Sequence, residues 1–158
     1  YKVKFTIKYI QIINPHIAHI GVGIAIIGIT CSSVFQNELD FNLNEGDEFK
    51  VNGKMVLFEE VETTNQINFQ ALRGKFLFDI EKNQSKKIEA GKNYYPVSKM
   101  ITSEAGILHQ WNKDIYFILG DQKNNEWFVK VLINPFVSFI WLGVIIMMYS
   151  GLIAVSRR

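Results

Sequence analysis

The chain has 158 residues, of which 48% are hydrophobic and 20% are charged, and its formal net charge is +2. This length allows one domain of about 100–150 residues and little more. The charges are segregated, because no Asp, Glu, Lys or Arg occurs in residues 9–37 or 131–156, and all 15 acidic residues lie in residues 38–126. This segregation argues against a simple soluble domain, and the lack of a Lys/Arg stripe among aromatic residues argues against nucleic-acid binding.

The first uncharged segment predicts transmembrane helix 1 over residues 9–32, after a basic segment over residues 1–8. A hydrocarbon core of about 30 Å needs roughly 20 apolar residues in a helix. Four polar residues interrupt the segment, namely Gln11, Asn14, His16 and His19. A secretory signal core is shorter, which disfavours a cleaved signal peptide. Because the chain starts at Tyr1, we expect a processed product or the tail of a longer polypeptide.

Residues 33–133 predict an external β-rich domain of six or seven short strands, folded as a small antiparallel barrel or sandwich. Its strongest hairpin signal is Asn52-Gly53 between two strand-like segments, Glu48–Val51 and Lys54–Glu60. An earlier turn is expected at Asn44–Gly46.

Two further strand pairs are expected. Ile67–Arg73 and Lys75–Glu81 are joined at Gly74, and Asp114–Gly120 and Trp127–Ile133, on either side of Asp121–Glu126, make a second clear hairpin. The cluster Asn83-Gln84-Ser85 is expected to end the first pair, and Tyr94–His109 reads as a long loop with a short helix.

The second uncharged segment predicts transmembrane helix 2 over residues 134–156, with Pro135 in its first turn and a basic end at residues 157–158. Phe136, Phe139 and Trp141 suit an interfacial aromatic belt. Five basic residues flank the outer ends of the two segments, and the positive-inside rule therefore places both termini inside and the β-rich domain outside. Two buried helices of a globular core are the alternative, but neither segment has a polar stripe.

His16 and His19 are the candidate site residues inside a membrane span. They are three positions apart and so lie roughly on one helix face. An ionisable group in hydrocarbon is costly and indicates function, and a neutral imidazole can ligate haem iron. The alternative, that the pair only makes interhelical hydrogen bonds, stays open. The spacing excludes the two as opposite axial ligands of one haem.

The remaining candidate residues give weaker indications of a functional site. His109 reads as polar surface, Cys31 as a small buried thiol that can form no intrachain disulfide, and Glu104 with Asp114 as an unconvincing acid–base pair. No phosphate-binding loop, HExxH helix, CxxC pair or nucleophile elbow occurs. No catalytic residue is therefore assigned, and enzyme activity stays open.

Several segments together resemble the C-terminal part of the CcmF family, the haem lyases of cytochrome c maturation. They are His16–Ala25, Ser33–Gln36, Leu43–Gly46, Met100–Ile107, Asp114–Gly120 and Asn134–Gly143. The resemblance implies that His19, directly before Ile-Gly-Val, ligates the iron of an intramembrane haem b, and it assigns no role to His16. The family's tryptophan-rich WWD segment is missing, because Trp111, Trp127 and Trp141 are isolated.

The resemblance therefore implies the C-terminal subunit of a split haem lyase that cannot attach haem alone. Its expected partners are the remaining part of the lyase, the haem chaperone CcmE, components that present apocytochrome c, and the lipid bilayer. The expected location is the mitochondrial inner membrane or a bacterial plasma membrane, with the β-domain on the intermembrane-space or periplasmic side. Two alternatives stay open, a structural or accessory subunit of a respiratory assembly without haem and a membrane-tethered β-domain that acts as an assembly factor.

Overall fold

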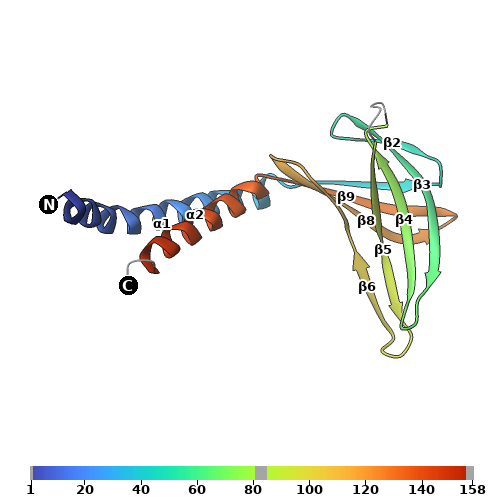
Figure 1. The fold of residues 1–158 in the computed structure, drawn as a ribbon. Helices are drawn as coiled ribbons and strands as arrows, with labels where there is room; N and C mark the ends of the chain where they lie inside the picture. The colour runs from blue at the N-terminus through green and yellow to red at the C-terminus, as the bar shows by residue number, and fades with distance from the viewer. Residues whose placement is uncertain (1, 81–84, 156–158) are drawn as a thin grey trace. The chain divides into compact units, whose positions relative to one another are not determined.

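The computed structural model describes residues 2–80 and 85–155, with side chains from residue 14 onward. Within these residues the chain forms two helices and two β-sheets, which separate into two compact units. Helices α1 (Lys2–Val34) and α2 (Val137–Val155), with Trp111–Lys113, make the first unit, and the sheets make the second (Figure 1). The strands are β1 (Asn37–Leu43), β2 (Glu48–Val51), β3 (Lys54–Asn65), β4 (Gln70–Phe78), β5 (Lys86–Tyr95), β6 (Met100–Glu104), β7 (Gly106–His109), β8 (Lys113–Lys123) and β9 (Glu126–Pro135).

The two helices pack antiparallel. Asn14, in the first half of α1, is hydrogen-bonded to Ser150 near the end of α2, and Gly28 near the end of α1 lies against Ile140. Asn14–Val34 and Val137–Val155, with 21 and 19 residues, are each apolar and long enough to cross a bilayer. The predicted division into inside-facing, spanning and external segments stays a prediction, and Arg157 and Arg158 lie outside the described residues.

The second unit is a β-sandwich, which is one of the two architectures expected from the sequence. One sheet has the strand order β1-β9-β8-β7 and the other β2-β3-β4-β5-β6. Antiparallel pairing joins β1 to β9 and β7 to β8 in the first sheet, and each strand from β2 to β6 to the next in the second. Strands β6 and β7 are separated by one residue, Ala105, so the chain passes from the edge of one sheet to the edge of the other there.

The core lies between the two sheets, where alternate residues of each strand point inward. Phe58 on β3, Phe76 on β4 and Phe117 on β8 are fully buried. The Phe58 and Phe76 rings stack at 5.0 Å between centroids, and Phe76 and Phe117 pack at 5.3 Å. Aromatic contacts from both sheets therefore join them into one core.

The local turn signals are confirmed. Asn52 and Gly53, with φ of 50° and 76°, join β2 to β3, and positive φ at both central residues is what a type I′ hairpin requires. In the earlier turn the backbone N–H of Asp47 donates to the Asn44 carbonyl over 3.1 Å. The hairpin of β8 and β9 is also present.

Three predictions about the strands are wrong. Gly74 makes no turn but lies inside the single strand β4, paired with Val61 and Ala90. A Cβ there would lie 3.3 Å from the side chains of Leu119 and Phe58, so the glycine fits under the core rather than bending the chain. Residues 94–109, expected as loop and helix, instead complete β5 and form β6 and β7. The described residues thus hold nine strands instead of six or seven, and the expected end of a strand pair at Asn83-Gln84 lies outside them.

The entry into α2 also differs from expectation. Pro135 is the last residue of β9 rather than part of the first helical turn. Phe136 follows with a φ of 61°, and its N–H donates to the Asn112 carbonyl over 2.8 Å. The Phe136 carbonyl then accepts from Phe139 N–H over 3.0 Å. One left-handed residue therefore ends the strand and starts the helix.

Candidate functional site

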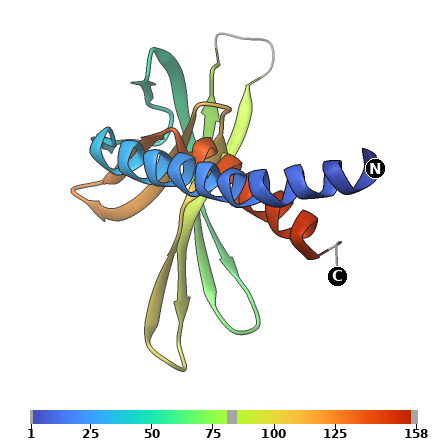
Figure 2. The same ribbon diagram turned by 90° about the vertical axis from the view of Figure 1, so that its left-hand side faces the viewer.

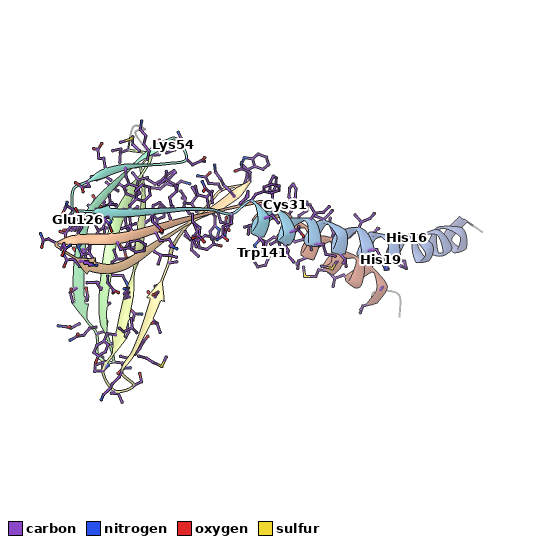
Figure 3. All side chains as sticks on the ribbon, turned by 180° about the vertical axis from the view of Figure 1, so that it is seen from behind. His16, His19, Cys31, Lys54, Glu126 and Trp141 are labelled. Atoms are coloured by element: carbon purple, nitrogen blue, oxygen red, sulfur yellow. The ribbon has the colours of Figure 1, made fainter. Side chains whose placement is uncertain are left out.

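The His19 side chain is exposed on α1 and is held by its own helix (Figure 3). Its ring Nδ1 lies 2.6 Å from the carbonyl oxygen of Pro15, one helical turn earlier. A carbonyl oxygen only accepts, so Nδ1 carries the proton and donates it. The other ring nitrogen, Nε2, then keeps its lone pair free. A backbone carbonyl that fixes one nitrogen in this way is the usual support for a metal-ligating histidine.

The surface around His19 is open. Gly23, one turn further along the same helix face, would meet no atom within 4 Å if it carried a Cβ. His16 is exposed as well. The α1 face that carries His19 therefore leaves room for a flat group beside the helix.

The opposite face of α1 packs against α2. Four buried α1 residues line this face, namely Asn14, Gly21, Ala25 and Gly28. A Cβ on Gly21 would lie 2.8 Å from the Gly143 carbonyl oxygen, and one on Gly143 would lie 2.5 Å from the Gly21 carbonyl oxygen. The two backbones touch at this point, as small residues permit in membrane helix pairs.

The polar bridge between the helices is made by Asn14 and Ser150. Asn14 Nδ2 donates to the Ser150 carbonyl over 3.0 Å. Ser150 Oγ lies 2.9 Å from both the backbone oxygen and Oδ1 of Asn14, and its one proton serves one of them at a time. Among the described residues, neither histidine contributes to the bridge. Hydrogen bonding between helices is thus performed by a pair that the sequence pattern did not single out.

The candidates of the β-sandwich are separated. His109 Nδ1 lies 3.1 Å from Asp114 Oδ1 across the β7–β8 pair, with the imidazole exposed and the carboxylate buried. Glu104 instead pairs with Arg73 at 2.7 Å. Burial, and the charge of Asp114, raise the pKa of the neighbouring Tyr116. Glu104 and Asp114 thus have different partners and form no acid–base pair.

No other arrangement for a metal is present in the described part of the chain. No group of three or more His, Cys, Asp or Glu side chains gathers there to hold an ion. Cys31 is a free, half-buried thiol. Sequence reasoning missed Asn14 with Ser150 and Arg73 with Glu104. For the first pair, the available signal was a polar residue in each uncharged segment. For the second pair there was no signal, because partners on neighbouring strands leave no spacing pattern in the sequence.

This fold defines a class of protein in which the chain forms an antiparallel β-sandwich between two membrane-type helices. Residues 34–135 match the family model of the CcmF C-terminal β-sandwich, and the chain belongs to this family. A cytochrome c-type biogenesis protein CcmF of Pseudomonas aeruginosa is 29% identical over 143 residues, and the corresponding protein ccl1 of Rhodobacter capsulatus is 32% identical over 146 residues.

These matches cover 90% and 89% of this chain but 22% of each relative. The chain thus spans about a fifth of the length of these relatives. A solved structure of the cytochrome c haem lyase CcmF has the same fold over 92% of this chain and 24% of its own, with a TM-score of 0.75 and 14% identity.

Proposed function

We propose that the chain is the C-terminal subunit of a split cytochrome c haem lyase, in which His19 supplies one axial ligand to an intramembrane haem b. The observation that carries this proposal is the hydrogen bond from His19 Nδ1 to the Pro15 carbonyl, 2.6 Å long, which leaves Nε2 free on an open helix face. Family membership supports the wider role in cytochrome c biogenesis.

The residues of this chain have limited tasks in such a lyase. When bound, haem b supplies one-electron redox chemistry. Pro15 fixes the tautomer and the direction of the His19 ring, and the hydrocarbon around α1 excludes water from it. A second histidine ligand would have to come from a companion chain, because the chain's other two histidines are His16, on the same helix, and His109, in the β-sandwich.

The proposed surroundings follow from the same assignment. The helices span an energy-transducing membrane, either bacterial or the mitochondrial inner membrane, and the β-sandwich lies on the periplasmic or intermembrane-space side. There it works beside the haem chaperone CcmE and the components that present apocytochrome c. The rest of the lyase supplies the tryptophan-rich segment that these 158 residues lack.

The test is the haem absorbance spectrum of the membrane assembly purified through this chain. His19→Gly removes the ligand, so the reduced-minus-oxidised haem b signal is expected to be lost, and free imidazole is expected to restore it. His16→Ala is the matched control on the same helix face and keeps the signal. An unaltered spectrum in His19→Gly would contradict the ligand assignment. If no haem copurifies with the unmodified assembly, the chain is instead a structural or accessory subunit.

A further inference from the structure

Two neighbouring hairpins of the five-stranded sheet form an uncharged projection, here called the hairpin arm. It consists of residues 63–72, where β3 turns into β4, and residues 93–103, where β5 turns into β6. Figure 2 shows both hairpins extending from the same sheet. Lys99 is the one charged residue in these two segments, in a chain that is 20% charged.

The arm exposes apolar side chains at both tips. Ile67 is 101% exposed and Val97 is 99% exposed, which is the full area of each residue. Behind them the rings of Phe69 and Tyr95 pack at 5.3 Å between centroids and tie one hairpin to the other. Met100, the strand partner of Tyr95, is exposed as well.

The inner face of the arm is mainly apolar. It carries a groove of about 250 Å³, lined by Leu72, Tyr94 and Ile101, by their neighbours Thr63, Gln70 and Ala71, and at the base of the arm by Lys92, which pairs with Asp121. An antiparallel sheet at a protein surface normally keeps one solvated polar face. In the arm both faces carry exposed apolar side chains, and single scattered apolar residues do not explain a patch gathered in this way.

The arm is held firmly at its base. Arg73 on β4 reaches over Gly91 on β5 to Glu104 on β6, with Nη2 and Oε2 2.7 Å apart. Asn93, which is buried, accepts from Arg73 over 2.7 Å and donates to Glu104 over 2.5 Å. A surface fixed before binding loses less conformational entropy on binding.

Charged groups return directly beyond this base. Lys75 on β4 contacts Glu60 and Glu62 on β3, at 2.9 and 2.5 Å. The hydrogen bond from Lys75 lowers the pKa of Glu60. The body of the sheet thus has a charged, solvated face, and the loss of charge is confined to the arm.

We propose that the hairpin arm is the surface on which the companion part of the haem lyase docks, a proposal that rests on the proposed function above. Permanent interfaces are more hydrophobic than transient ones, and interface cores lose charged residues and gain Tyr, Phe and Met. The arm has this composition. The relatives carry about four fifths of their length outside the region matched by this chain, so a large permanent partner is available.

The experiment uses the full chain in its membrane assembly, with a photo-cross-linking amino acid placed at Ile67 or at Val97. Both positions are expected to give adducts with the companion lyase chain, identified by mass spectrometry. The matched control is Ile107 on β7, an exposed apolar residue of the same sandwich outside the arm, which gives no such adduct. In parallel, the double variant Ile67→Asp, Val97→Asp is expected to lower the amount of companion chain that copurifies about tenfold or more, as for a hot spot. The control Ile107→Asp leaves that amount unchanged.

Each other outcome overturns the docking proposal. Adducts with lipid would show that the arm contacts the bilayer. Adducts with apocytochrome c would show that it binds the substrate, and adducts with a second copy of this chain would show that it self-associates. Unchanged companion recovery with the doubly substituted arm also contradicts it. If the unmodified chain recovers no companion at all, the split-lyase proposal fails and the docking proposal fails with it. If a companion with haem is recovered but the arm does not contact it, only the docking proposal fails.

Discussion

At the scale of single residues, α1 separates two tasks by helix face. Asn14 and Gly21 face α2 and determine how the two helices pack, whereas Pro15 and His19 belong to the free face. A substitution on one face therefore leaves the contacts of the other intact. This separation allows helix packing and haem ligation to be tested by different variants of the same helix.

The bridge between Asn14 and Ser150 is expected to stabilise the helix pair measurably. Interhelical hydrogen bonds in membranes average about 0.6 kcal/mol, with an upper value near 1.7. Asn14→Ala removes the side-chain contacts and should weaken the helix pair by about 1–2 kcal/mol, and Ser150→Ala, which keeps the bond to its own carbonyl, by about half as much. The free energy of unfolding in mixed micelles measures both.

Thr30→Val is the matched control, because Thr30 is an exposed polar residue of α1. It should leave the free energy of unfolding within about 0.5 kcal/mol of the unmodified chain. An effect of Asn14→Ala no larger than that of the control would show that the bridge does not stabilise the pair. The haem spectrum is expected to survive Asn14→Ala wherever the helices remain folded.

At the scale of elements, the sequence predicted what local chemistry determines. The type I′ turn at Asn52-Gly53 and the two uncharged helices follow from residues close in the chain. The role of Gly74 does not follow from its neighbours in the chain, because Leu119 and Phe58 on other strands leave little room for a side chain there. His16 and His19 were both candidates because a histidine is unusual in a span, and the family resemblance pointed to His19, whose Pro15 partner emerges only from the helix geometry.

Gly91 shows how one element supports its neighbours. A Cβ at this position would lie 1.9 Å from the Leu72 carbonyl oxygen and 2.9 Å from Arg73 Nη1. Gly91→Ala is therefore expected to destabilise the β-sandwich by about 1–3 kcal/mol through overpacking, lowering the Tm of the full chain in detergent by roughly 5–15 °C. Lys87→Ala, at an exposed position on the same strand, should change Tm by no more than about 3 °C. Equal Tm values for the two variants would show that the sandwich accommodates a side chain at position 91 without overpacking.

At the scale of the whole molecule, charge and helix direction lead to one expected topology. The antiparallel packing of α1 and α2 puts the beginning of one helix and the end of the other on the same side. Five basic residues lie outside the two apolar spans, Asn14–Val34 and Val137–Val155, namely Lys2, Lys4, Lys8, Arg157 and Arg158. Both ends of the chain are thus expected on the inside, where positively charged flanks are retained.

This topology is tested by cysteine labelling in a Cys31→Ser background. Glu45→Cys places a thiol in the exposed turn between β1 and β2, outside the hairpin arm, and is expected to react with a membrane-impermeant maleimide in intact spheroplasts or mitoplasts. Lys2→Cys, at the other end of the proposed topology, is expected to react only after the membrane is opened. The reverse pattern would invert the orientation and move the β-sandwich to the inside. Labelling of both positions without opening would instead show that α1 does not span the membrane, because a bilayer crossed by this helix separates the two thiols.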